Sequence, residues 1–242
     1  MTWNVGEVYW PWNGNQLKDA DVEVVARVVA ALDPDIVLLQ ELLDERQLRT
    51  IAGRGYASQL AQACGYDRHV GVLVKSRHEP RFSDHLLSPT TRGVVEAQLT
   101  LDGLEMRAFS LHFDVFNRPR RLAQVHCAAA IIGGGSSQLT IAGGDFNYDP
   151  VASARLGYTE DLESEAALGV HLSDVATDSG PTLVGLLRVD RLLARGDMIA
   201  STRSFTSTER TPLGDHAPLV CDLALRSPGS ARPPIRPSRI RR

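Results

Sequence analysis

Short apolar runs separated by turns recur along the chain and outnumber the amphipathic stretches. Runs rich in Val, Ile and Leu predict buried strands, whereas apolar residues spaced three and four apart predict helices. We expect strands over residues 2–5, 36–39, 70–74, 94–100, 106–111, 186–193, 198–207 and 219–225, and a central strand that starts at residue 139. We expect helices over 21–32 and 122–132, a broken helical segment over 44–64, and a loop with short helical pieces over 151–168. This order predicts mixed or mainly antiparallel sheets with the helices outside.

The central strand ends at two glycines, which are followed by Asp145 and Asn147. The glycines would let the backbone approach a ligand closely or adopt a positive φ, and alternation along an extended chain predicts that Asp145 and Asn147 point the same way. A carboxylate beside an amide suits a phosphate, because the acid orients or deprotonates a water while the amide donates to a phosphate oxygen. The alternative is a strand followed by an Asx turn, for which Gly, Asp and Asn are the usual residues.

Polar residues also stand at the ends of other predicted strands. These residues are Asn4, Glu41, His112, Asp190, Asp215 and His216. If the strand ends meet at one rim, the collection matches a metal-assisted phosphoester hydrolase. Glu41 and Asp215, with Asn4 acting through a water, offer hard oxygen ligands for Mg²⁺ or Mn²⁺, and the spacing typical of zinc ligands is absent. His216 offers a proton acceptor beside Asp215.

Composition favours one domain over residues 1–225, followed by a disordered tail over 226–242. The formal net charge of −3 includes six arginines and no acid in that tail, so residues 1–225 carry −9. The tail is either merely solvated or a contact for polyanions. Three distant cysteines argue against a disulfide framework and favour core thiols. Residues 1–12 lack a basic residue and no apolar run would span a bilayer, so we expect a cytoplasmic protein without membrane insertion. No feature of the sequence indicates an obligate protein partner.

Six motifs in order give a resemblance that covers the chain up to about Leu225. They are Trp3-Asn4-Val5, Pro34-Asp35-Ile36-Val37-Leu38-Leu39-Gln40-Glu41, Ser110-Leu111-His112, Gly144-Asp145-Phe146-Asn147, Arg188-Val189-Asp190 and Gly214-Asp215-His216-Ala217-Pro218. The chain resembles the endonuclease/exonuclease/phosphatase superfamily, which includes DNase I, exonuclease III and AP endonucleases, inositol polyphosphate 5-phosphatases and neutral sphingomyelinases. The resemblance implies a four-layer α/β/β/α sandwich with two mixed, mainly antiparallel sheets, helices outside and the site at one rim.

The resemblance also implies a role for each matching residue. Glu41 would be the principal metal ligand, with Asn4 and Asp215 near the ion. Asp145 would position or deprotonate the water, and His216, oriented by Asp190, would act as base or phosphate ligand. Asn147 would hold a phosphate oxygen, and His112 would donate to the phosphate. AP endonucleases, which have a tyrosine at the position of His112, resemble the chain less. The implied activity is divalent-metal-dependent hydrolysis of a phosphoester by in-line attack of water on phosphorus.

The substrate is less specified than the reaction. Trp10, Trp12, Phe113 and Phe116 lie in loops beside predicted site residues, where they either stack on bases or pack against the core. A basic loop contains Arg118 and Arg121. Their side chains either contact a phosphate backbone or lie in solvent at the start of a helix. Arg191 stands where many relatives have an aromatic residue, and it would face solvent or substrate.

We therefore expect a phosphodiesterase or nuclease acting on DNA or RNA. The alternatives are a hydrolase of small-molecule or lipid-headgroup phosphoesters, and a binding module without catalysis on the same scaffold. A salt-sensitive affinity for nucleic acid would favour the nuclease.

Overall fold

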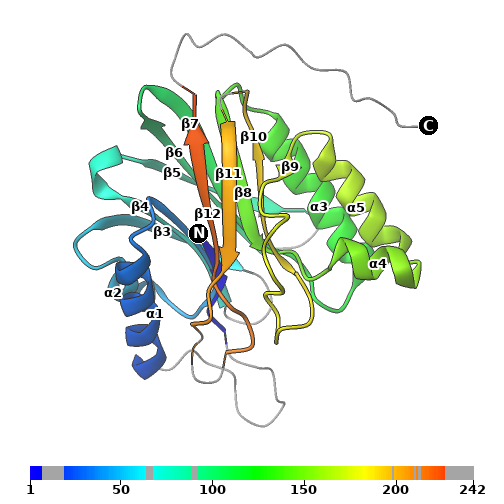
Figure 1. Ribbon diagram of the computed structural model, residues 1–242, viewed down its shortest axis with the longest axis horizontal. Helices are drawn as coiled ribbons and strands as arrows, with labels where there is room; N and C mark the ends of the chain where they lie inside the picture. Colours follow the sequence, from blue (N-terminus) through cyan, green and yellow to red (C-terminus); the bar gives the residue numbers. More distant parts are fainter. Residues whose placement is uncertain are drawn as a thin grey trace.

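The computed structural model describes residues 1–6, 19–63, 68–88, 92–197, 199–209, 211 and 214–226, and these form four layers (Figure 1). Helices α1 (Asp19–Leu32) and α2 (Glu45–Ala52) lie on one side of two central sheets. Helices α3 (Arg118–Gly133), α4 (Pro150–Leu156) and α5 (Thr159–Gly169) lie on the other side. The predicted four-layer α/β/β/α sandwich is confirmed.

The first sheet has six strands in the order β11-β12-β1-β2-β4-β3. Their bounds are β1 (Thr2–Asn4), β2 (Ile36–Leu42), β3 (Tyr56–Ala63), β4 (Arg68–Lys75), β11 (Ile199–Thr206) and β12 (Leu219–Leu225). Strands β1 and β2 are parallel, and every other described pair in this sheet is antiparallel. Because β1 and β2 are parallel, both strands end at the same rim of the sheet.

The second sheet also has six strands, in the order β5-β6-β7-β8-β10-β9. Their bounds are β5 (Arg81–Leu87), β6 (Arg92–Leu101), β7 (Leu104–His112), β8 (Leu139–Asp145), β9 (Ser173–Asp174) and β10 (Asp190–Arg195). Strands β7 and β8 are parallel, with α3 as their crossover, and the other described pairs are antiparallel. The ends of β7 and β8 therefore also share a rim, where His112 pairs with Asp145.

Three apolar clusters hold the layers together. Val25 and Val29 of α1 pack with Trp3 on the outer face of the first sheet, as the helical spacing predicted. Leu38 and Leu192 belong to the cluster between the two sheets. A third cluster buries one face of α3 against the second sheet. Since every layer has an apolar face against the next, the strand ends are held in fixed relative positions.

A buried charged network ties the second sheet to α3. Glu96 on β6 accepts hydrogen bonds from His85 (2.7 Å), Gln98 (2.9 Å) and Arg107 (2.6 Å). Arg107 also donates to the carbonyl oxygens of residues 131 and 132 at the end of α3. Burial alone would raise the pKa of Glu96, but these hydrogen bonds and the arginine charge outweigh it and hold that pKa below its ordinary value.

The broken helix expected over residues 44–64 was wrong in its second half. Helix α2 ends at Gly53, which has a φ of 53° and donates its N–H to the carbonyl of Arg49. The chain then turns into β3, which pairs with β4 along its whole length. Strand β3 lacks β-branched residues, so its pairing with β4 overrides a weak local preference. The polar strand β5 was missed for the same reason.

The segment after the central strand is also more regular than predicted. Asp149 caps α4 by accepting hydrogen bonds from the N–H groups of Val151 and Ala152, and Gly157 ends that helix with a φ of 71°. Helix α5 follows directly, where short helical pieces were expected. The strand expected over 186–193 starts only at Asp190, because residues 183–187 form a tight turn.

Several predictions fall outside the described residues. These concern Trp10, Trp12, Cys64 and the tail beyond Arg226. Cys127 and Cys221 are free and half-buried, not fully inside the core. Within the described residues, no helix combines the length and the apolar character needed to cross a lipid bilayer.

Candidate active site

Four strand ends, two from each sheet, bring polar side chains together at one rim. The side-chain amide of Asn4 donates to Oε1 of Glu41 (3.2 Å) and to Oδ2 of Asp145 (2.9 Å). Nε2 of His112 lies 3.8 Å from the same oxygen of Asp145 and 3.9 Å from Oε1 of Glu41. The carboxylate of Asp145 therefore lies at the meeting point of β1, β7 and β8.

His216 approaches Asp145 from the other side. Its Nδ1 lies 2.7 Å from Oδ2 of Asp190, and its Nε2 lies 3.8 Å from Oδ2 of Asp145 and 3.8 Å from Oδ1 of Asp215. Burial lowers the pKa of His216, but the negative charges of Asp190, Asp145 and Asp215 outweigh burial and raise the pKa to about 10. The three carboxylates around His216 therefore favour its protonated form.

Left-handed backbone conformations aim two of these side chains. Glu41 has a φ of 64° within an irregularity of the β2–β4 ladder, so its carboxylate turns toward Asn4. A Cβ at Gly6 would lie 2.1 Å from Oε2 of Glu41, so only glycine leaves room for that carboxylate. Asn147 has a φ of 55° and lies beyond the strand, so strand alternation does not set its direction as predicted. Its side chain instead donates to the carbonyl of Phe113 (3.0 Å).

The two glycines before Asp145 let β8 pack closely on its neighbours. A Cβ at Gly144 would lie 1.8 Å from the carbonyl oxygen of Leu111 on β7, and the φ of Gly144 is 152°. A Cβ at Gly143 would lie 2.6 Å from the side chain of Leu192 and 2.8 Å from that of Leu38. The predicted positive φ is confirmed at Gly144, and the close approach that the structure shows is to neighbouring strands; the predicted approach to a ligand stays a prediction.

The donor set fits a hard divalent cation. Ligand atoms of Asp145, Asp190 and His216 all lie within 4.8 Å of one another. Oδ1 of Asp190 is buried and has no hydrogen-bond partner among the described residues, so it has an unused lone pair in the site. Glu41 is not within this group of ligand atoms, but the side-chain amide of Asn4 bridges its carboxylate to that of Asp145. Carboxylate oxygens are ligands that Mg²⁺ and Mn²⁺ prefer. The amide nitrogen of Asn4 faces these carboxylates, while its Oδ1 accepts the N–H of Gly6 (3.0 Å).

The basic residues predicted to contact substrate have internal partners. Arg121 is buried, and its guanidinium donates to Oδ1 of Asp161 (2.6 Å) and to the carbonyl of Asp114 (2.7 Å). Its predicted substrate role is wrong, because α3 packs on α5 and turns this side chain inward. Arg118 lies 3.5 Å above the ring of Tyr158 with about two-fifths of its side chain exposed.

The prediction that Arg191 faces solvent or substrate is also wrong. Alternation along β10 points Asp190 into the site and Arg191 to the opposite face, under α5. There Arg191 is fully buried and donates to Glu165 (2.8 Å) and Asp174 (3.2 Å). These partners raise its pKa although burial opposes the charge. Arg191 thus braces the strand that carries Asp190.

Thr182 supports the site and was missed. Its hydroxyl accepts the backbone N–H of Asp190 (3.0 Å), and its carbonyl accepts the N–H of Ala217 (2.8 Å). It therefore fixes Asp190 and the segment of His216 to each other. A lone threonine in a loop gives no sequence signal for such a role.

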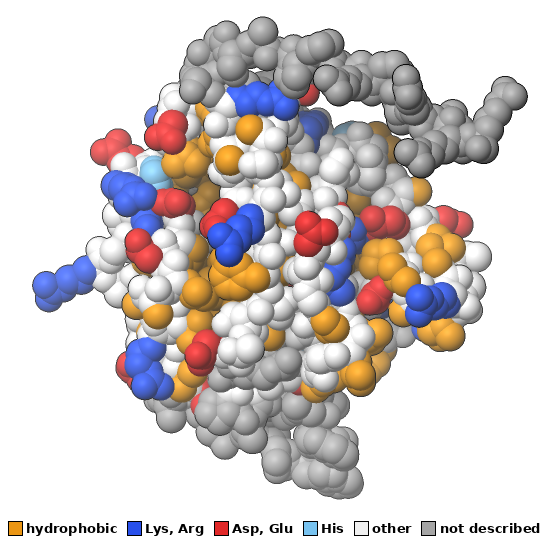
Figure 2. Space-filling view, viewed as in Figure 1, with side chains coloured by type: hydrophobic (Ala, Val, Ile, Leu, Met, Phe, Trp, Pro, Cys, Tyr) orange, Lys and Arg blue, Asp and Glu red, His pale blue; other side chains and the backbone are white. Residues whose placement is uncertain are grey.

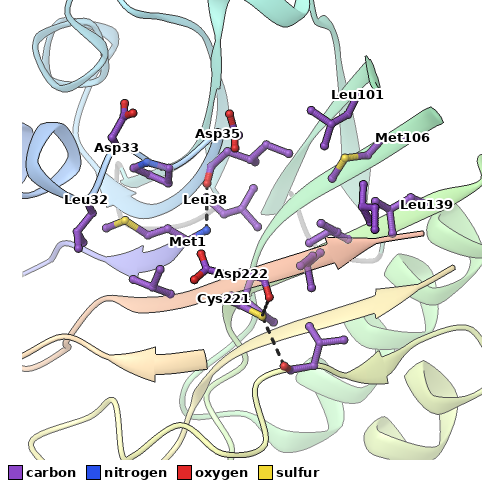
Figure 3. A pocket seen from close by; sticks show the side chains of 18 residues that line it. Met1, Leu32, Asp33, Asp35, Leu38, Leu101, Met106, Leu139, Cys221 and Asp222 are labelled. Carbon is purple, nitrogen blue, oxygen red and sulfur yellow. Dashed lines mark hydrogen bonds between the residues drawn. The ribbon is translucent and has the colours of Figure 1, made fainter. Parts of the chain in front are cut away.

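A cavity of about 270 Å³ lies between the sheets at the opposite end of the sandwich (Figure 3). Its lining includes Ile36 and Leu139, where β2 and β8 begin, whereas the site lies where these strands end. Figure 3 shows apolar side chains from both sheets with Asp35 and Asp222 beside them. None of the site residues described above lines this cavity.

Comparison with protein families accounts for this arrangement. Residues 1–216 match the Endonuclease/Exonuclease/phosphatase family. The chain belongs to this family. Its members are generally phosphoester hydrolases that depend on a divalent metal. The search of the curated proteins finds no significant match.

Solved structures from the same superfamily share the fold. A conserved protein of unknown function from Enterococcus faecalis is 19% identical, with a TM-score of 0.71 over 93% of this chain and 98% of that chain. A mannosyl-6-phosphatase from Bacteroides thetaiotaomicron is 19% identical, with a TM-score of 0.69 over 93% and 98%. Truncated TDP2 from Caenorhabditis elegans is 19% identical, with a TM-score of 0.67 over 84% and 90%. At this identity the comparison establishes the fold only.

Proposed function

We propose that this family member is a divalent-metal-dependent phosphoester hydrolase that acts by in-line attack of water on phosphorus. The observation that supports this proposal most directly is the position of Asp145, whose Oδ2 lies within 4 Å of side-chain nitrogen atoms of Asn4, His112 and His216 at one rim. We also propose that residues 1–225 form the catalytic domain and that 226–242 are a separate tail. A cytoplasmic location stays a prediction.

The residues for a cation and for the reaction lie side by side. Glu41 and Asp215, with Asn4 acting through a water, would hold Mg²⁺ or Mn²⁺ next to the donor atoms of Asp145 and Asp190. When bound, the ion would offset negative charge on the phosphate and on the leaving oxygen.

The remaining groups orient water and phosphate. Asp145 would align the water and accept one of its protons, because its carboxylate is held in place by Asn4 and flanked by two imidazoles. His216, fixed by Asp190, and His112 would donate to phosphate oxygens, as would the second N–H of the Asn147 side-chain amide, whose first N–H donates to Phe113. The water oxygen bonds to phosphorus while the bond from phosphorus to the leaving oxygen breaks, and the leaving oxygen takes up a proton.

The test compares wild-type protein with Asp145→Asn and His216→Ala on bis-p-nitrophenyl phosphate with Mg²⁺ or Mn²⁺. We expect turnover by wild type and a loss of at least about 100-fold in both variants. Asp178→Asn, an exposed aspartate, serves as the matched control and should keep the wild-type rate. Equal turnover by Asp145→Asn and wild type would refute the assignment.

A further inference from the structure

Exposed apolar side chains gather around the proposed site. Among large hydrophobic residues exposed on the described chain, six lie in three segments at this rim: Val115, Phe116, Val151, Val184, Leu186 and Leu187. The segments follow β7, follow β8 and precede β10, and these three strands are consecutive in the second sheet. Figure 2 shows hydrophobic side chains at the right of the molecule, where Figure 1 places α4 and α5.

The segment before β10 presents its apolar residues on a fixed turn. The N–H of Val184 donates to the carbonyl of Asp215 (2.7 Å), and Leu183 forms a bridge with His216. Val184 has a φ of 39°, a strained conformation for a β-branched residue. Leu186, two residues on, is 77% exposed. The turn therefore holds Leu186 outward next to the Asp215–His216 segment at a conformational cost.

The segment after β7 presents Phe116 in a similar way. Oδ1 of Asp114 accepts the N–H of Phe116 (3.0 Å) and of Asn117 (2.8 Å), which closes a turn. The guanidinium of Arg121 donates a hydrogen bond to the carbonyl oxygen of Asp114, at the start of that turn. Phe116 is 75% exposed, three residues beyond Phe113, whose carbonyl anchors Asn147. Thus the segments next to β7 and β10, the two strands that flank β8, each carry an exposed apolar side chain on a hydrogen-bonded turn.

Described arginines on and beside these segments already have partners. Arg120 lies 3.5 Å from Asp114, Arg121 is paired with Asp161, Arg118 stacks on Tyr158, and Arg188 lies 2.5 Å from Asp174. Nearby carboxylates or an aromatic ring thus offset these positive charges, and residues 1–225 carry a formal charge of −9, which opposes the approach of a polyanion. This side of the rim therefore favours an apolar group over a second phosphate.

We infer that the substrate is an amphiphilic phosphoester, whose phosphate enters the site while an alkyl or aryl substituent packs on Phe116 and Leu186. This inference rests on the proposed function and narrows its substrate class. Burial of each apolar side chain against such a group lowers the free energy of the bound state in proportion to the area covered. The same chemistry occurs in soluble alkyl or aryl phosphodiesters and in phospholipids.

The experiment uses two substrates with one leaving group, octyl p-nitrophenyl phosphate and methyl p-nitrophenyl phosphate. We expect wild type to show kcat/KM at least about tenfold higher for the octyl ester, mainly through KM. Phe116→Ser and Leu186→Ser should each lower the octyl-to-methyl ratio several-fold. Val170→Ser is the matched control, because Val170 is 75% exposed at the end of α5 and lies outside the three segments. Its ratio should equal that of wild type.

The outcomes separate this inference from the proposed function. No hydrolysis of either ester in the presence of metal would overturn the proposed function. Three outcomes would overturn the inference alone. The first is hydrolysis of both esters at equal kcat/KM, and the second is an octyl-to-methyl ratio that the Phe116 and Leu186 variants leave unchanged. The third is faster cleavage of an oligonucleotide than of the octyl ester. Phosphatidylcholine vesicles form the last arm: cleavage there and of the monomeric octyl ester supports the inference with a lipid source, and cleavage of the octyl ester alone supports a soluble source.

Discussion

Gly144→Ala should destabilise the protein strongly, because the central strand depends on a missing Cβ. The added atom would lie 1.8 Å from a backbone oxygen of β7, and real Cβ contacts essentially never fall below 3.0 Å. The strands must therefore separate by about 1.2 Å, which no side-chain movement can relieve because the obstacle is backbone. We expect about two ladder hydrogen bonds to be lost, at about 1 kcal/mol each, and about 1–3 kcal/mol of backbone strain.

The expected loss in the free energy of unfolding is thus about 3–5 kcal/mol, a large part of the total of a typical domain. Urea unfolding followed by far-ultraviolet circular dichroism measures it, and an unchanged m-value validates the comparison. Gly157→Ala is the matched control, since Gly157 has a φ of 71° but nothing within 4 Å of the added atom, and we expect a loss of about 1 kcal/mol. The reasoning is refuted if Gly144→Ala costs no more than Gly157→Ala.

Three further predictions follow from buried contacts. Thr182→Val leaves the N–H of Asp190 without its partner, so unfolding free energy should fall by about 1–3 kcal/mol with an altered pH–rate profile, and Thr182→Ser should restore both. Because the pKa of Glu96 is lowered in the folded state, this residue stabilises the fold at pH values above its unfolded pKa of about 4.5, and the stabilisation is lost as pH falls through the folded pKa. Glu96→Gln should therefore weaken the fall in the free energy of unfolding at acid pH, measured by urea titrations. Arg121→Met removes the nearest cation from buried Asp161 and leaves it the hydroxyl of Ser153 (2.8 Å) and Arg118 (3.8 Å), so the free energy of unfolding should fall by about 1.5–3 kcal/mol; a rise in KM without that loss would revive the substrate role.

Strand ends were the part of the site that the sequence predicted well. Apolar runs that stop at polar residues located Glu41, His112 and Asp145, and the parallel pairing of β1 with β2 and of β7 with β8 brought them to one rim. The pattern could not show the left-handed backbone that aims Glu41, because Glu is not a residue that favours it. Nor could it show Thr182, whose role depends on two contacts distant in sequence.

Arginines were the least predictable residues. Arg121 and Arg191 were both expected near solvent or substrate, yet each is buried against a carboxylate from α5. A charged residue in a loop or after a site residue is usually exposed, and only the packing of α5 on the second sheet and α3 decides otherwise. The same packing turned the expected loop over 151–168 into two helices.

Metal dependence is the most direct test of the central claim. The rate on bis-p-nitrophenyl phosphate should be measured for wild type and Glu41→Gln, first with EDTA and then after addition of Mg²⁺ or Mn²⁺, with calorimetric titration of the same metals into both proteins. The account predicts loss of the wild-type rate in EDTA, recovery with metal, and weaker metal binding with a lower rate in Glu41→Gln. An undiminished rate in EDTA, or identical metal binding and rate in Glu41→Gln and wild type, would contradict it.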